Sequence, residues 1–299
     1  MTETAFPAAR ASCPLCGSSS VETGSKNGVP LRRCTRCRHR FAGIQPDDGA
    51  LDAIYGDDYF TREYGDYHAE ARALAARGAA YRRIVERRRT GGRVLDVGAA
   101  AGYVLEGFTA DANWTGTGIE LNPAMARAAR ARGVDVRAGT VESVALAGEF
   151  DAVLLVQVIA HFPHVVETLT RLRERTAPGG VWVIETWDRE SAVARLLGRR
   201  WHEINPPSVL HWFSRRSLDA LLASLGFERV ARGRPRKTIG ADHVRALLGA
   251  HPLLGPLARV IPRGAEIPYP GDDVFWSAYR LRDDARAPTH GDGGASADA

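Results

Sequence analysis

The chain has no cysteine beyond residue 37, almost no lysine and no long hydrophobic run. It lacks the stretch of about 18 apolar residues that a membrane-spanning helix needs, and no basic segment followed by an apolar run opens it. We therefore expect a cytoplasmic protein without a membrane partner. With 299 residues, 44% of them hydrophobic and 25% charged, the chain suits one substantial globular domain with a small satellite module.

The scarcity of lysine leaves the net charge of +5 to arginine, with 38 Arg against 2 Lys. The arginines are spread along helical stretches and do not form one basic block. Such a spread is typical of solvated helix faces and disfavours a nucleic-acid groove.

The four cysteines form two Cys-x-x-Cys pairs, Cys13 with Cys16 and Cys34 with Cys37, and 17 residues separate the pairs. This spacing predicts a structural Zn²⁺ site with four thiolates, in which the metal supplies folding energy that so short a segment lacks. Free thiols and a redox pair are weaker alternatives, and a closed four-thiolate shell leaves no position for catalysis. The nearby His39 is expected on the surface.

Composition and periodicity divide the chain into four parts. We expect a zinc ribbon at residues 11–45, an aromatic and helical connector at 46–90, and a main domain at 91–282 with an insertion at about 186–273. The final part, 283–299, has no large apolar side chain and is expected to be disordered.

The main domain alternates strands with helices, which predicts an α/β fold with a doubly wound, mostly parallel, Rossmann-like sheet. A helix from HAEARALAARGAAYRRIVERRR precedes it. Expected strands are RVLDVG, WTGTGIEL, VDVRAG, DAVLLVQVI, VWVIET and DDVFWSAYRL. Expected helices are AGYVLEGFTADA, PAMARAARARG, VVETLTRLRERTAPGG, RESAVARLLGRR and VRALLGAHPLLGPLARVI, and RSLDALLASLGFERV reads as helix followed by strand.

A small-residue turn follows the first of these strands and runs from Asp96 through Gly98 to Gly102. Doubly wound sheets bind ligands at this position. Glu120 ends the second strand, where a carboxylate accepts ribose hydroxyls. A dinucleotide is the rival ligand, but Asp96 would repel a diphosphate and attract the ammonium of a methionine group.

These motifs resemble those of the class I S-adenosylmethionine-dependent methyltransferases, particularly a bacterial subgroup with an N-terminal zinc ribbon. The resemblance covers about residues 12–282 and includes CPLCGS, RCRHRF, YGDDYF, RVLDVGAAAG, GIELNP, FDAVLLVQVIAHF, LTRLRERTAPGG, ARLLGRRW, NPPSVLHWFSRRSL and LLASLGFERV. It implies S-adenosylmethionine as cofactor and structural Zn²⁺ in the ribbon.

The resemblance also implies a role for each residue of the cofactor site. The methionine part would contact Asp96, Gly98, Ala100 and Gly102, and the ribose would bind Glu120 with Leu121 beside it. The adenine would contact Thr140 and Val141, and Gln157 and Val158 would form the floor beneath the sulfonium. Ala100 replaces a glycine common in the family, a small change that the turn should tolerate.

Histidine is the side chain best suited to remove a proton from an acceptor near neutral pH. His161 and His211 are the candidates, with a structural role as the alternative for each, and Tyr59 is the preferred lid residue. Relatives often have Glu-His where this chain has Ala160-His161, and Pro-Pro-Glu-His where it has Pro206-Pro207-Ser208-Val209. Trp187, Trp201, Trp212 and Phe213 are expected mainly in the core, with an aromatic lid as the alternative.

Three functions are compatible with the sequence. The leading hypothesis is methyl transfer to an oxygen or carbon of a small molecule with a glycosyl or secondary-metabolite scaffold. RNA methylation through the ribbon is the second, because arginines surround its second cysteine pair. The third is a non-methylating role in rearrangement, cyclisation or binding, because fold alone does not define function.

Overall fold

The protein is built around a seven-stranded mixed sheet, seen in a computed structural model that describes residues 10–56, 67–235, 238–241, 245, 260–262, 266–268 and 273–285. The strand order is β10-β13-β8-β7-β4-β5-β6. The five strands from β8 to β6 run parallel, and β13 is antiparallel to both of its neighbours. The predicted α/β, mostly parallel fold is therefore confirmed.

Each strand of this sheet corresponds to one of the apolar segments expected from the sequence. In chain order they are β4 (Gly92–Val97), β5 (Trp114–Glu120), β6 (Val136–Ala138), β7 (Phe150–Val156), β8 (Thr176–Trp187), β10 (Phe227–Gly233) and β13 (Val274–Leu281).

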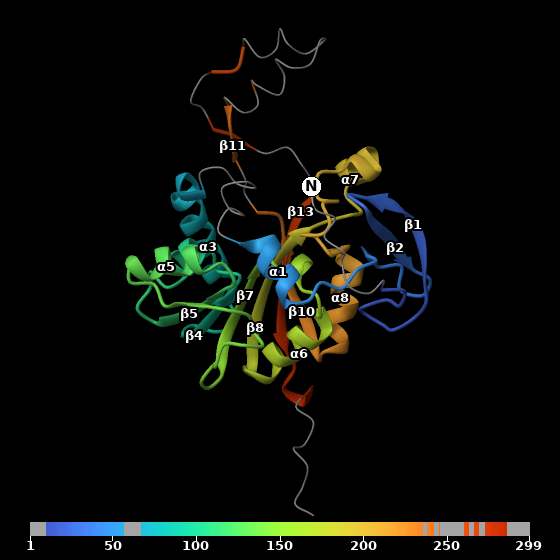
Figure 1. The fold of residues 1–299 in the computed structure, drawn as a ribbon. Coiled ribbons are helices and arrows are strands. Elements are labelled where there is room, and N and C mark those ends of the chain that lie inside the picture. Colours follow the sequence, from blue (N-terminus) through green and yellow to red (C-terminus); the bar gives the residue numbers. More distant parts are fainter. Residues whose placement is uncertain are drawn as a thin grey trace, which may run out of the picture.

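Helices cover both faces of the sheet (Figure 1). One face packs against α3 (Ala71–Val85), α4 (Tyr103–Phe108) and α5 (Pro123–Ala131), and the other against α6 (Val165–Glu174) and α8 (Arg215–Ser224). Local signals set the helix starts: Asn122 accepts from the amides of Ala124 and Met125 at the start of α5, and Ser214 forms a capping box at the start of α8.

The four-cysteine segment forms a second, antiparallel sheet with the order β1-β2-β3-β9. Three of its strands belong to the ribbon: β1 (Ser20–Lys26), β2 (Val29–Cys34) and β3 (Arg40–Ala42). The fourth, β9 (His211–Trp212), comes from the loop after β8, and Phe41 pairs with His211. One apolar cluster joins ribbon residues such as Leu31 to Leu210 and Trp212, so the ribbon packs as part of the larger structure.

The remaining elements are short. They are α1 (Asp48–Tyr55), η1 (Tyr67–Glu70), η2 (Ile159–His161), α7 (Ala192–Leu197), η3 (Gly198–Arg200), β11 (Thr238–Gly240), β12 (Glu266–Pro268) and η5 (Asp283–Ala285), where η denotes a 3₁₀ helix. Trp201 and Trp212 are buried, which confirms their expected place in the core, whereas Trp187 is half-buried. Phe213 is buried as well.

One predicted helix ends earlier than expected. The sequence predicts a helix up to Gly180, but α6 ends at Glu174 and β8 begins at Thr176. Thr176 pairs with Phe150 of β7, and its hydroxyl accepts from the indole nitrogen of Trp182 at 2.9 Å. These tertiary contacts extend the strand through the Pro-Gly-Gly sequence.

Two predicted segments lie largely outside the described residues: the helix at VRALLGAHPLLGPLARVI, and the tail at 283–299 that is expected to be disordered, of which 283–285 form η5. Within the described ranges, no helix combines the length and apolar character needed to cross a membrane.

Two glycines allow α3 and α4 to approach closely. A Cβ added at Gly78 would lie 2.0 Å from the carbonyl oxygen of Val104, and one added at Gly107 would lie 1.9 Å from that of Ala75. Neither oxygen can move without displacing a helix backbone, so this contact requires glycine on both sides.

We predict that Gly78→Ala lowers the free energy of unfolding by about 1–3 kcal/mol, which is the usual cost of overpacking. Urea denaturation followed by circular dichroism measures it. The control is Gly49→Ala in α1, where the nearest heavy atom to an added Cβ would be 3.7 Å away. Equal urea midpoints for the two variants would show that the contact between α3 and α4 does not require glycine at residue 78.

Candidate cofactor and metal sites

The turn after β4 has three residues in the left-handed region, Gly98 (φ 72°), Ala100 (φ 48°) and Gly102 (φ 79°). A Cβ at Gly98 would lie 2.6 Å from Cγ2 of Val158. The amides of Gly98 and Ala99 both donate to the carbonyl oxygen of Ile119. The turn is thus hydrogen-bonded to the end of β5 and lies against Val158, the second residue after β7.

Glu120 connects the turn with the start of α5. Its Oε2 accepts from the amide of Ala100 and its Oε1 from the amide of Asn122, each at 2.8 Å. Burial raises the pKa of Glu120, and the two amides act in the opposite direction. Because each carboxylate oxygen has about two acceptor positions, each can still accept a ligand hydroxyl.

Asp96 lies beside Glu120 and is 2% exposed. Its Oδ2 is buried and has no hydrogen-bond partner within the described part of the chain. Burial, followed by the charge of Glu120, raises the pKa of Asp96 to about 8. A buried carboxylate oxygen without a partner fits a ligand that brings a cationic amine.

The other residues expected at the cofactor lie at the same edge of the sheet. The amide of Gly139 donates to the carbonyl oxygen of Glu120 at 2.9 Å, which places Thr140 and Val141 directly after that contact. Leu121 is half-buried next to Glu120. Gln157 and Val158 follow β7, and Gln157 has a φ of 59°.

Sequence reasoning missed a buried polar cluster beside Gln157. Glu185 is 0% exposed; its Oε1 accepts from Nε2 of Gln157 at 2.8 Å and from the guanidinium of Arg77 at 3.3 Å. Its Oε2 accepts from the hydroxyl of Tyr81. Burial and the charge of Glu185 raise the pKa of Tyr81. The single carboxylate within the apolar run VWVIETW was the signal for this cluster.

Tyr55, at the end of α1, covers the turn together with Tyr67. Both side chains pack against Ala100, and the side-chain amide of Asn122 donates to the carbonyl oxygen of Tyr55 at 3.1 Å. Tyr59, the expected lid residue, lies outside the described residues.

His161 lies within hydrogen-bond distance of Tyr55. Nδ1 of His161 is 2.7 Å from the carbonyl oxygen of Ser208 and 3.0 Å from the hydroxyl of Tyr55. Because the carbonyl can only accept, Nδ1 carries the proton and the neutral ring has its lone pair on Nε2.

His211 is placed differently, because it belongs to β9 of the antiparallel sheet and is 3% exposed. Its Nε2 lies 2.8 Å from the carbonyl oxygen of Phe162, and its Nδ1 lies 3.3 Å from Nε2 of His39. Burial lowers the pKa of His211 to about 3. These contacts favour a packing role for His211. The expectation of a surface position for His39 is wrong, because this ring is 0% exposed against His211 and Phe213.

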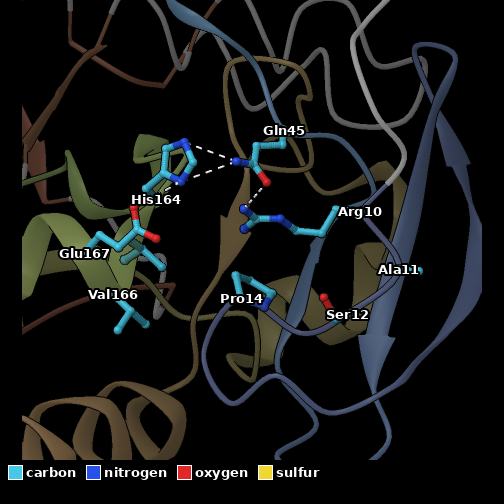
Figure 2. A pocket seen from close by; sticks show the side chains of 9 residues that line it. Arg10, Ala11, Ser12, Pro14, Gln45, His164, Val166 and Glu167 are labelled. Carbon is cyan, nitrogen blue, oxygen red and sulfur yellow. Dashed lines mark hydrogen bonds and ion pairs between the residues drawn. The ribbon is translucent and has the colours of Figure 1, made fainter.

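A cavity of about 320 Å³ lies apart from the predicted site residues, none of which lines it. Figure 2 shows it between the start of the ribbon and the start of α6, with Gln45 reaching towards both Arg10 and His164. Its polar lining belongs to the contact between ribbon and body.

The four cysteine sulfurs lie within 4.8 Å of one another, and none of them forms a disulfide. The separations are 3.6 Å for Cys13 and Cys37, 3.5 Å for Cys16 and Cys34, and 3.6 Å for Cys16 and Cys37. A tetrahedral Zn²⁺ with bonds of about 2.3 Å needs sulfurs about 3.8 Å apart. The arrangement therefore fits Zn²⁺.

A doubly wound sheet with a glycine turn and two buried carboxylates at its carboxyl edge defines a Rossmann-like class of cofactor-binding protein. A family model described as a methyltransferase domain matches residues 67–232, which is more than half of the chain. The chain belongs to the class I S-adenosylmethionine-dependent methyltransferases, and it adds a four-cysteine cluster before that domain.

Similar proteins agree with this family. The ubiquinone biosynthesis O-methyltransferase of Xanthomonas oryzae pv. oryzae is 30% identical over 152 residues, which cover 43% of this chain and 63% of that protein. The protein of the same description from Dechloromonas aromatica is 28% identical over 162 residues, covering 51% of this chain and 69% of that protein. The chain thus spans less than two thirds of the Xanthomonas relative.

A solved structure shows the shared fold. The S-adenosylmethionine-dependent methyltransferase of Thermotoga maritima has a TM-score of 0.51 and 22% identity, and the match covers 77% of this chain and 100% of that one.

We predict that the purified chain contains one zinc ion, which is released only after about four equivalents of a mercurial thiol reagent, one for each zinc-bound thiolate. The chain has 4 cysteines, so no other thiol interferes. Zinc release is followed with a chromogenic chelator. Cys34→Ala should lose the metal, whereas Arg36→Ala, between the ligands and exposed, should retain it. Four reactive thiols without bound metal would contradict the site.

Proposed function

We propose that the chain transfers a methyl group from S-adenosylmethionine to an oxygen or carbon of a small molecule. The observation that carries the proposal is Oδ2 of the buried Asp96, which has no hydrogen-bond partner among the described residues, beside the Glu120 carboxylate that holds the turn. Asp96 would bind the ammonium of the methionine part, and Glu120 would accept the ribose hydroxyls. Gly98, Ala100 and Gly102 would line the methionine part, with Leu121 beside the ribose, Thr140 and Val141 at the adenine, and Gln157 and Val158 below the sulfonium.

The bound cofactor supplies an electrophilic methyl group. The chain must bring the acceptor in line with it and remove a proton from an acidic acceptor. His161 would take that proton on Nε2, because Ser208 holds the proton on Nδ1. The hydroxyl of Tyr55 donates to the same carbonyl oxygen of Ser208 at 2.8 Å and would keep it, and with it the ring of His161, in place.

The relatives and the ribbon support the proposed class of acceptor. The Xanthomonas and Dechloromonas relatives are O-methyltransferases, which supports an oxygen acceptor. The four-cysteine cluster supports the subgroup with a zinc ribbon, whose members favour glycosyl or secondary-metabolite scaffolds. A four-cysteine metal site would suit a reducing compartment such as the cytoplasm. In this scheme residues 11–45 form the ribbon, 46–90 connect and cover the site, and 91–282 carry it.

We predict that binding of S-adenosylhomocysteine at pH 6.5 releases close to one proton from Asp96. Below the raised pKa of about 8 the free carboxyl is protonated, and pairing with the ligand ammonium lowers that pKa and ionises the group. Calorimetry in buffers of different ionisation enthalpy measures the release. Asp96→Asn should abolish it and weaken binding by about 10- to 100-fold. Glu174→Gln, an exposed carboxylate at the end of α6, is the matched control. Unchanged proton release in Asp96→Asn would exclude the assignment.

We also predict that His161→Gln lowers turnover by about 10²–10⁴-fold, the usual contribution of a general base. Transfer of labelled methyl to phenols, catechols and glycosides is measured, and affinity for S-adenosylhomocysteine should stay the same. His202→Gln, an exposed histidine paired with Glu203, serves as the control. Full activity of His161→Gln would assign the proton transfer elsewhere. Consumption of an acceptor without label transfer would instead favour a rearrangement or cyclisation.

RNA is the second candidate acceptor, because arginines distant in the sequence meet in space. Arg33 and Arg40 are directly opposite each other on β2 and β3, and the guanidinium of Arg189 donates to the carbonyl oxygen of Arg38 at 3.2 Å. Burial lowers the pKa of Arg40, and the charges of Arg33 and Arg38 add to this effect. Such a patch attracts phosphates.

Fluorescence anisotropy with single-stranded RNA tests this second candidate. An RNA enzyme would bind tightly, lose affinity steeply with salt, and lose it further in an Arg33→Ser, Arg40→Ser variant. A small-molecule enzyme would bind RNA weakly and methylate none.

A further inference from the structure

The segment 159–164, which carries His161, is held in place from the ribbon side. Leu210 makes the first connection, because its amide donates to the carbonyl oxygen of Ala160 at 2.9 Å. Its own carbonyl oxygen accepts from the amide of Ala42 at 2.9 Å. One residue therefore joins β3 of the ribbon to the backbone immediately before His161.

A histidine pair makes the second connection. The carbonyl oxygen of Phe162 can only accept, so Nε2 of His211 carries a proton and donates at 2.8 Å. In the neutral ring Nδ1 is then an acceptor, and Nε2 of His39 donates to it at 3.3 Å. Nδ1 of His39 is left as a bare acceptor, which agrees with its being buried without a partner in the described ranges. A hydrogen-bond chain thus runs from the ribbon to the residue after His161.

The third connection reaches the start of α6 and is visible in Figure 2. Nε2 of Gln45 lies 3.1 Å from Nε2 of His164 and 3.3 Å from Nδ1. Arg10 donates to Oε1 of Gln45 at 2.5 Å, and its amide donates to Gly43 at 2.9 Å. These contacts hold His164, the last residue of the segment 159–164, in place.

Apolar packing follows the same path. Val29 and Leu31 of β2 belong to one buried cluster with Ala160, Leu210 and Trp212. Opening the ribbon would expose this cluster to water and remove the packing under the segment.

The cofactor turn is held by different residues. Gly98 and Ala99 donate to Ile119, and Ala100 donates to Glu120, so these contacts come from β5 within the body. The backbone hydrogen bonds of the turn therefore do not involve the ribbon, and the turn meets the acceptor half of the site through side-chain packing by Val158 and Tyr55.

We propose that the four-cysteine ribbon is a positioning element for the acceptor half of the site: its metal-bound fold sets the place of segment 159–164 and of His161, through Leu210, His211 and Gln45. The inference rests on the proposed function in one respect, that His161 faces the acceptor. The proposed coupling between the ribbon and segment 159–164, which leaves the cofactor turn unchanged, can be measured without enzyme activity.

Hydrogen–deuterium exchange on the full chain, with zinc and after its removal by a mercurial and a chelator, tests the coupling. Removal should speed amide exchange at least tenfold in peptides covering 158–164 and 206–212. Exchange in 94–100 and 117–121, and affinity for S-adenosylhomocysteine, should change less than threefold. The proposal is overturned if 158–164 stays protected, and equally if all four regions lose protection together.

Substitution of His211 in the zinc-loaded protein gives an independent test. His211→Ala removes the donor to Phe162 and should speed exchange at 160–164 with zinc still bound, whereas His211→Gln offers an amide Nε2 in its place and should restore slow exchange. Val21→Ala, on the exposed side of β1, is the control and should match the unmodified chain. Equal exchange in His211→Ala and the unmodified chain would refute this connection. Failure to bind S-adenosylhomocysteine would count against the proposed function. The exchange rates would still test the coupling between the ribbon and segment 159–164.

Discussion

Parallel pairing of β4 with β5 is the constraint on which the cofactor site depends. The register places Asp96 opposite Gly118 and Val97 opposite Ile119, so both strands end at the same edge with a carboxylate each. Neither carboxylate would be stable there alone, because burial disfavours its charge. The amides of Ala100 and Asn122 hold one, and Oδ2 of the other has no partner among the described residues. The pairing thus buries a carboxyl group whose charged form a cationic ligand would stabilise.

The elements around this edge could be predicted from the sequence because their signals are local. Buried parallel strands read as apolar runs, and the glycine turn and the Asn122-Pro123 helix start each lie within a few residues. The zinc cluster could equally be predicted, since two close Cys-x-x-Cys pairs are the usual spacing of a four-thiolate zinc site. Adjacent parallel strands then bring Asp96 and Glu120 to one edge without further information.

The parts that escaped prediction depend on contacts between distant segments. Glu185 meets Tyr81 and Arg77 only because α3 packs against β8. Pairing of β9 involves two residues, too few for any periodic pattern. His39 is buried because β9 covers it, although its own neighbours in the sequence are polar. The early start of β8 likewise depends on Phe150, a residue of another strand.

The shared fourth strand also means that the ribbon's structural boundary differs from its sequence boundary. A ribbon cut at residue 45 would leave the outer edge of β3 without its partner and the inner faces of Val29 and Leu31 without Trp201 and Leu210. Recombination between related genes would therefore preserve the fold only when both stretches, about 170 positions apart in the chain, came from the same parent. Substitutions at the two stretches should accordingly accumulate in step during divergence.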